Sequence, residues 1–103
     1  MAKRATVGLA RAGGVGHNGS GDIFLAFATG NHLPLQHNKP FDIQMLPHDH
    51  LDPFFEAAAE ATEESILNAL TAAESMHGWQ GHSAQALPLD ELQSIMRRYQ
   101  PYR

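Results

Sequence analysis

The residues of this chain best placed to do chemistry are a hydroxyl and a carboxylate two positions apart, Ser20 and Asp22. They stand where a polar loop runs into a strongly apolar segment, so they would lie at the mouth of a buried element. If the local backbone is extended, both side chains point to the same face and act jointly on one ligand group. Ser, Gly and Asp are also ordinary turn residues. The residues alone leave both interpretations open.

The loop ahead of this pair is dense in glycine, with five glycines between Gly13 and Gly21. Glycine has no Cβ atom, so it permits positive φ and the close approach of another group, at a cost in conformational entropy. The stretch is therefore either a long hairpin loop or the rim of an active site. In the first interpretation the glycines allow the chain to turn, and in the second they allow a ligand to approach the backbone closely.

Two better-known glycine motifs are disfavoured by what surrounds the loop. Residues 14–19 match G-x-G-x-x-G after an expected strand, but that motif must open a helix whose amides hold a pyrophosphate. An apolar strand is expected here instead, which argues against nucleotide binding. Nor does Ser20 lie in a G-x-S-x-G nucleophile elbow, because Asn18 and Asp22 occupy the flanking glycine positions.

Seven histidines raise the question of a metal site. Two sets could supply imidazole and carboxylate ligands: His48-Asp49-His50 with Asp52, and His32 with His37. Their spacing matches no helical H-E-x-x-H pattern, and loop histidines without a fixed scaffold are more often solvated or hydrogen-bonded. We therefore expect no metal ligands and no cofactor.

The first half of the chain predicts two strands. Ala5–Arg11 has the β-branched and apolar character of a short strand, and Asp22–Thr29 is a continuous apolar run typical of a strand buried on both faces. The second strand should lie in the middle of a sheet. Residues 31–50, rich in proline and histidine and without helical periodicity, are expected to form a long surface excursion.

The second half predicts two helices. Asp52-Pro53 supplies an N-cap and a first helical residue, and apolar residues then recur at steps of three and four until Gly78, which should end the helix. Leu89–Tyr99 is a short amphipathic helix with two arginines in its last turn. Trp79 falls in the loop between the two helices.

Two strands and two main helices make an α+β inventory, and no internal repeat is present. Two strands are marginal by themselves, and a strand that is apolar on both faces needs cover on each side. We therefore expect residues 1–103 to be a single partial domain that completes a larger sheet. The remaining strands would come from further sequence or from another chain.

Composition limits the partners. The 103 residues have a formal charge of −4 and 43% hydrophobic residues, as in a globular domain, without a basic stripe that could neutralise phosphates. No apolar run reaches the length of a membrane helix or a signal peptide. We expect neither nucleic acid nor membrane as a partner. The absence of cysteine is compatible with any compartment, and the cytoplasm is favoured.

Three blocks of sequence together resemble the C-terminal part of the DmpA-like aminopeptidases, the self-processing L-aminopeptidase/D-esterases that include the β-peptidyl aminopeptidases. The resemblance covers nearly the whole chain, and its blocks fall in matching order: AKRA with GLAR, then NGSGDIFLAF, then EATEESILNAL with ALP. The order of three blocks is more specific than any single motif.

The resemblance implies an αββα sandwich similar to the N-terminal-nucleophile hydrolases, made as a precursor that cleaves itself before a serine. That serine becomes the nucleophile, with its own α-amine as base. Ser20 would be a second active-site serine and Asp22 the acidic residue that assists it or meets the substrate's amine. Asn18, Gly19 and Gly21 would border the substrate. The nucleophile and an oxyanion-stabilising asparagine are expected upstream of Met1.

The expected function is thus that of the C-terminal portion of a serine aminopeptidase, acting on peptides, amides or esters and inactive by itself. Its expected partners are the remainder of the aminopeptidase chain or a copy of itself in a homo-oligomer, and a peptide or amino-acid amide substrate. The alternative is a non-catalytic truncated relative, serving as a structural or small-molecule-binding module.

Overall fold

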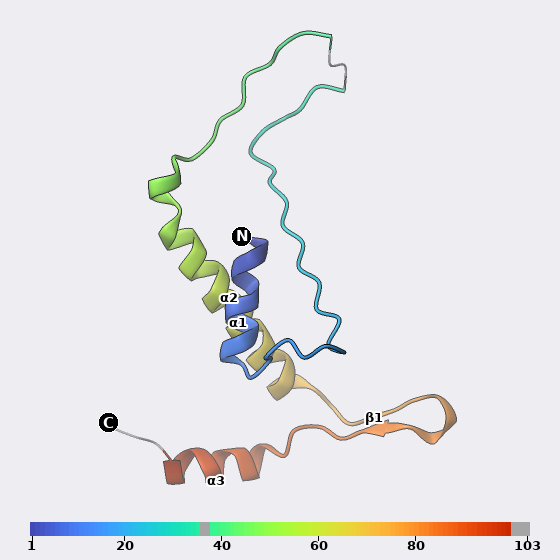
Figure 1. The fold of residues 1–103 in the computed structure, drawn as a ribbon. Coiled ribbons are helices and arrows are strands. Elements are labelled where there is room, and N and C mark those ends of the chain that lie inside the picture. Colours follow the sequence, from blue (N-terminus) through green and yellow to red (C-terminus); the bar gives the residue numbers. More distant parts are fainter. Residues whose placement is uncertain (36–37, 100–103) are drawn as a thin grey trace. The chain divides into compact units, whose positions relative to one another are not determined.

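The computed structural model describes residues 1–35 and 38–99 and contains three α-helices, two short strands and two 3-10 turns (Figure 1). Met1–Glu63 and Glu64–Arg103 form two compact units, each described by itself below. The mixture of helices and a small antiparallel sheet confirms the α+β class. The elements are α1 Ala2–Arg11, η1 His48–His50, α2 Asp52–Ala72, β1 Met76–His77, η2 Trp79–Gly81, β2 Ser83–Ala84 and α3 Leu89–Tyr99.

The strand predicted over Ala5–Arg11 is wrong, because these residues belong to helix α1. The prediction relied on the β-branched and apolar character of Thr6, Val7 and Leu9, although Gly8 and the alanines weakened it. Arg4, Val7 and Arg11, however, recur at helical spacing and line one side of α1 next to α2. Gly8 is buried in this face, so its presence reflects tertiary contact rather than local propensity.

The first two glycines of the glycine-rich loop end α1. The Gly13 N–H donates to the Ala10 carbonyl at 3.0 Å and the Gly14 N–H to the Leu9 carbonyl at 2.9 Å, which is the paired pattern of a Schellman motif. Gly13 has φ of 99°, a left-handed conformation that glycine adopts without a steric penalty. This part of the loop therefore serves the helix.

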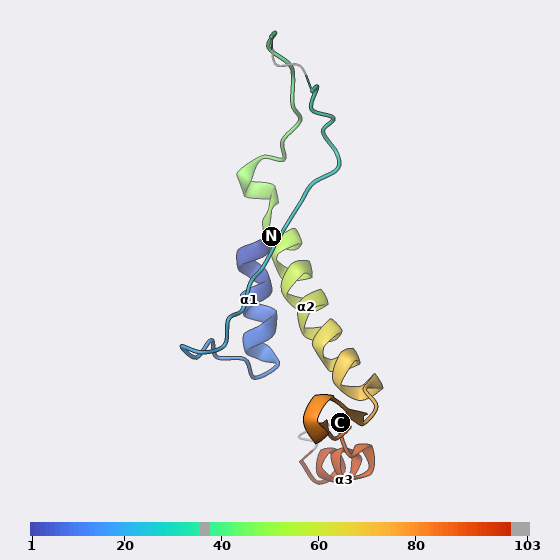
Figure 2. The same ribbon diagram turned by 90° about the vertical axis from the view of Figure 1, so that its right-hand side faces the viewer.

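Helices α1 and α2 lie side by side and run in the same direction (Figures 1 and 2). Their point of closest approach pairs Gly8 with Ala59, the two buried residues in the described part of the chain. A Cβ atom added to Gly8 would meet the Ala59 carbonyl oxygen and would lie 2.7 Å from Thr62 Cβ. Small residues at this crossing allow the two backbones to come together.

Each end of the α1–α2 contact carries a charged interaction. The Arg4 guanidinium lies 4.4 Å from the centre of the Phe55 ring, a cation–π contact worth about 0.5–1 kcal/mol at an exposed site. Arg11 Nη1 lies 3.5 Å from Glu63 Oε2, in a partly exposed ion pair that contributes at most about 1 kcal/mol. Both pairs join α1 to α2 on either side of the Gly8–Ala59 contact.

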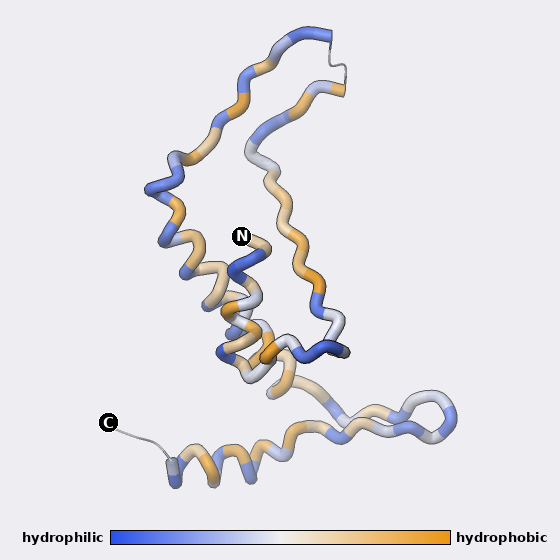
Figure 3. The backbone as a smooth tube through the Cα atoms, in the orientation of Figure 1, coloured by the Kyte–Doolittle hydropathy of each residue, from blue (hydrophilic) through white to orange (hydrophobic). Residues whose placement is uncertain are grey.

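The strand predicted over Asp22–Thr29 is not formed either. The segment is irregular, and β1 with β2 is the one strand pair in the described part of the chain. Ile23, Leu25 and Phe27 are 91%, 88% and 85% exposed, and Figure 3 shows the apolar colour along this stretch. A strand exists through hydrogen bonds to neighbouring strands, and the described residues offer this segment none.

Within the predicted excursion over residues 31–50, residues 31–35 and 38–47 are irregular as expected, and η1 follows at His48–His50. Its two limbs are joined by the side chain of Asn31, whose Nδ2 donates to the Gln44 carbonyl at 2.9 Å. In return the Gln44 N–H donates to Asn31 Oδ1 at 2.8 Å. The Asn31 side-chain amide thus forms the two hydrogen bonds to the Gln44 backbone that a neighbouring strand would otherwise form.

Helix α2 begins at Asp52 as predicted but ends at Ala72, so the prediction that it continues to Gly78 is wrong. Gly78 belongs instead to a β-hairpin in which Met76 pairs with Ala84 and His77 with Ser83. The base of the hairpin is closed by Ser75 Oγ, which accepts the Ala86 N–H at 2.9 Å. These local hydrogen bonds end the helix before any capping glycine is reached.

The closing helix α3 spans Leu89–Tyr99, with the bounds that the sequence predicts. Asp90 and Glu91 lie in its first turn and Arg97 and Arg98 in its last turn, which complements the helix dipole. No helix among the described residues has the length and apolar character needed to cross a membrane.

Candidate active site

Ser20 lies at the end of a tight turn. Its N–H donates to the His17 carbonyl at 2.9 Å, which encloses Asn18 and Gly19 as the central turn residues. Ser20 and Asp22 are both exposed, at the start of the apolar segment 22–29. The two side chains are thus available to a ligand or to another part of the protein.

The backbone between the two residues is not extended. Gly21 has φ of 69°, in the left-handed region that favours glycine. Ser20 and Asp22 are expected on one face only where the backbone between them is extended, so this expectation does not hold here. Turn chemistry does describe residues 17–21, and the active-site roles of Ser20, Asp22, Asn18, Gly19 and Gly21 stay predictions.

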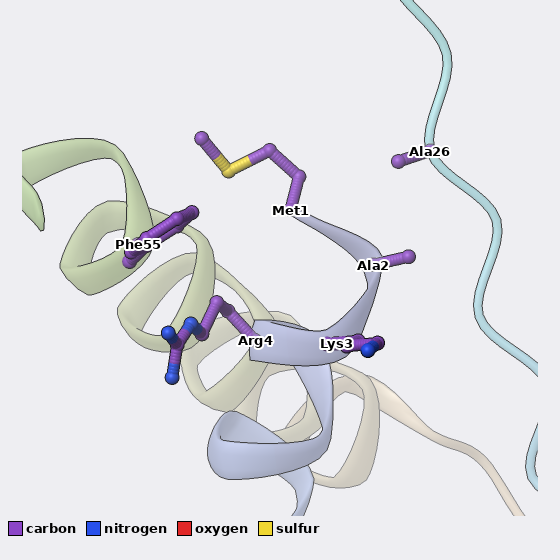
Figure 4. A pocket seen from close by; sticks show the side chains of 6 residues that line it. All are labelled: Met1, Ala2, Lys3, Arg4, Ala26 and Phe55. Carbon is purple, nitrogen blue, oxygen red and sulfur yellow. The ribbon is translucent and has the colours of Figure 1, made fainter. Parts of the chain in front are cut away.

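A cavity of 510 Å³ lies at the N-terminal end of α1 (Figure 4). It is lined by Met1, Ala2, Lys3, Arg4, Ala26 and Phe55. In Figure 4 the methyl groups of Ala2 and Ala26 point toward one another across it. Residue 26 comes from the segment that follows Asp22, but Ser20, Asp22 and the loop glycines do not line the cavity.

Sequence reasoning gave no role to the residues of this cavity, since it placed Arg4 just ahead of a strand. A cleft with two basic side chains and an aromatic ring suits a group with both apolar and anionic character. The helical spacing of Arg4 and Arg11 is the signal that identifies this face of α1.

A smaller cavity of 160 Å³ lies between α1 and α2, lined by Arg4, Val7, Arg11, Phe55, Glu56 and Ala59.

The candidate metal ligands do not assemble. Among residues 1–35 and 38–99, no three His, Cys, Asp or Glu side chains lie close enough to hold a metal ion. His48 and His50 lie exposed in η1, and His37 falls outside the described residues.

Comparison with known proteins identifies the family. Residues 1–84 match the family model of Peptidase family S58. The chain is 44% identical to the β-peptidyl aminopeptidase BapA of Sphingosinicella microcystinivorans over 96% of its length, and 33% identical to BapA of Sphingosinicella xenopeptidilytica over all of it. It spans about a quarter of each of these relatives, 25% and 26%.

Two solved structures share the fold. The PH0078 protein from Pyrococcus horikoshii OT3 is 48% identical, with a TM-score of 0.90 over 98% of this chain and 29% of that one. The L-aminopeptidase D-Ala-esterase/amidase from Ochrobactrum anthropi is 41% identical, with a TM-score of 0.84 over 96% and 28%. That protein is described as a variant of the Ntn hydrolase fold and a prototype of the serine aminopeptidases.

These comparisons confirm the resemblance to the DmpA-like aminopeptidases and the similarity to the N-terminal-nucleophile hydrolase fold. The family match covers more than half of the chain and includes α1, the glycine-rich loop, α2 and the hairpin. On this evidence the chain belongs to Peptidase family S58.

Proposed function

We propose that this chain is part of a serine aminopeptidase that removes N-terminal residues from peptides, amides or esters. The observation that carries the proposal is its 44% identity, over 96% of its length, to a protein named a β-peptidyl aminopeptidase. Because the chain spans a quarter of that relative, the activity belongs to the whole protein. The part proposed here is the Ser20/Asp22 side of the active site, with the nucleophilic serine on a segment that precedes Met1.

In the proposed reaction the serine hydroxyl attacks the substrate carbonyl and its proton passes to the serine's own α-amine. In a peptide or amide the carbon–nitrogen bond breaks and the departing amine takes up that proton; in an ester the carbon–oxygen bond breaks and the departing alcohol takes it up. An ester on the serine remains, which water then hydrolyses to release the free acid. Ser20 would supply a hydroxyl beside the nucleophile, and the Asp22 carboxylate would pair with the substrate's ammonium group.

In this proposal Ser20 and Asp22 lie on one side of the active site and the nucleophilic serine lies on another segment. The exposure of the Ser20–Asp22 turn and of the apolar residues after it supports this arrangement. Ile23 and Leu25 are almost fully exposed, and burying each against another layer would contribute about 1.5–3 kcal/mol. A missing layer that covers this segment would also bring a second wall to Ser20 and Asp22. The turn would then border a closed pocket rather than solvent.

The test is Asp22→Asn in the full-length protein, with Asp42→Asn as a matched carboxylate change elsewhere in the first unit. We expect Asp22→Asn to lower kcat/KM for amino-acid amides about tenfold or more, since a charge-assisted contact is worth about 1.5–3 kcal/mol. N-acetylated substrates lack the ammonium group. For these substrates the wild type and Asp22→Asn should have the same kcat/KM. Unchanged kcat/KM in Asp22→Asn would exclude the role of Asp22.

Ser20→Ala tests the second half of the proposal and should lower kcat with little change in KM. If the full-length protein shows no hydrolysis of peptides, amides or esters, the aminopeptidase proposal is wrong. A non-catalytic module would then be the better description of this chain.

A further inference from the structure

The β-hairpin between α2 and α3 is an ordered feature that the proposed active site does not use. Its strands β1 and β2 are two residues each, and the Gly78 N–H donates to the His82 carbonyl at 2.7 Å beneath the tip. Ser75 Oγ also contacts Gln85 Oε1 at 3.3 Å at the base. The hairpin is therefore held by its own hydrogen bonds, although so short a two-stranded unit is only marginally stable by itself in water.

The tip presents an aromatic ring in a constrained backbone. Trp79, the one tryptophan of the chain, is 83% exposed, and Met76 on β1 is 70% exposed. The His82 N–H donates to the Trp79 carbonyl at 3.2 Å, with φ of 57° at Gln80 and 79° at Gly81. Positive φ at both central residues is the arrangement of a type I′ hairpin turn, which matches the twist of the strands.

The composition of the hairpin is that of an interface. From Ser75 to Pro88 there is no Asp, Glu, Lys or Arg, although charged residues stand on either side at Glu74 and Asp90. Interface cores are depleted in charged residues and enriched in Trp and Met. Gln80 carries a left-handed conformation that a non-glycine residue holds at a cost, which a partner surface would offset.

We infer that the hairpin tip, with Trp79 at its centre, docks into an apolar recess on the part of the full-length protein that this chain lacks. The inference rests on the proposal that the chain is one part of a larger aminopeptidase. The rest of such a protein is the partner surface, because this chain covers only 25% and 26% of the length of its β-peptidyl aminopeptidase relatives. The family match runs through both strands to residue 84, so the hairpin belongs to that larger fold.

The experiment measures the environment of Trp79 in the full-length protein. The difference in fluorescence between the wild type and Trp79→Phe isolates this one ring, with N-acetyltryptophanamide as the fully accessible reference. We expect an emission maximum at shorter wavelength than the reference and acrylamide quenching several-fold weaker. Trp79→Ala should lower the melting temperature, whereas Tyr99→Ala, a change at another exposed aromatic residue on α3, should lower it less.

Three results would overturn the inference. Trp79 could be quenched as strongly as the reference, or the reading frame could contain no further segment. Trp79 could also become protected in the 103-residue chain as the concentration of that chain rises. The last result would assign the hairpin to a second copy. Aminopeptidase activity measured on the same samples separates the two proposals. An active protein with accessible Trp79 refutes only the docking, and a protected Trp79 without activity refutes only the proposed function.

Discussion

The contact between α1 and α2 depends on Gly8, and adding one methyl group there should destabilise the first unit. In Gly8→Ala the new Cβ meets the Ala59 carbonyl oxygen and lies 2.7 Å from Thr62 Cβ and 3.0 Å from the Glu63 nitrogen. The Ala59 and Glu63 atoms belong to the α2 backbone, so no side-chain rotation relieves the overlap. The helices must separate instead, which weakens the cation–π contact of Arg4 and the ion pair of Arg11.

The expected magnitude combines two opposing effects. Overpacking a close contact costs about 1–3 kcal/mol, whereas replacing a helical glycine with alanine favours the helix by about 0.5–1 kcal/mol. The contact dominates, because backbone atoms on α2 cannot move without the whole helix. We therefore expect Gly8→Ala to lower the free energy of unfolding by about 1–2 kcal/mol.

The assay is urea denaturation followed by circular dichroism at a helix-sensitive wavelength, on the wild type, Gly8→Ala and Gly8→Val. Gly30→Ala is the control, because a Cβ at Gly30 meets nothing within 4 Å. It should leave stability unchanged or raise it by less than about 1 kcal/mol. The reasoning is refuted if Gly8→Ala is as stable as the wild type, or if Gly8→Val is no worse than Gly8→Ala.

Three smaller changes test the loop and the hairpin. Gln80→Asn should stabilise the hairpin by about 0.5–1 kcal/mol, since asparagine accepts positive φ more readily, and slower amide exchange at the hairpin would show it. Ser75→Ala removes the acceptor of the Ala86 N–H and should speed exchange at that amide, at a cost of about 1 kcal/mol. Asn31→Ala should free the two limbs of the excursion, seen as faster exchange at the Gln44 amide; unchanged exchange there would contradict the bridging role of Asn31.

The sequence predicts best those elements whose signals are local. Helix α3 has its bounds where its apolar spacing and terminal charges place them, and α2 starts at Asp52 for the same kind of reason. The β-branched and apolar residues of Ala5–Arg11 favour a strand locally, whereas helix α1 is stabilised by the contact of Gly8 with Ala59, more than fifty residues away in sequence. A contact of this kind cannot be recognised within the segment itself, where the helical spacing of Arg4, Val7 and Arg11 is the only local signal that the fold uses.

The β-hairpin could not be predicted because its own residues carry too little local signal. Strands of two residues are too short for any alternation to be recognised, and the turn over Gln80-Gly81 lacks the Asn-Gly or Asp-Gly pair that predicts a type I′ turn. The apolar character of segment 22–29 predicts a strand, but the segment is irregular, and residues 1–35 and 38–99 provide no neighbouring strand for it. Apolar character shows that a segment needs cover, but strand pairing also needs a partner.

The glycine-rich loop divides into parts with different tasks. Gly13 and Gly14 cap α1, so their conformations are explained without any ligand. The remaining turn, from His17 to Asp22, holds both candidate active-site side chains, and its positive φ at Gly21 re-aims the chain between them. Substitution of Gly21 by a residue with a Cβ would strain that bend, whereas Gly19 has no positive φ and open space around it. If the site requires the backbone geometry of the turn, Gly21→Ala should lower kcat/KM and Gly19→Ala should not. If the site requires space for the substrate, Gly19→Ala should lower kcat/KM as well.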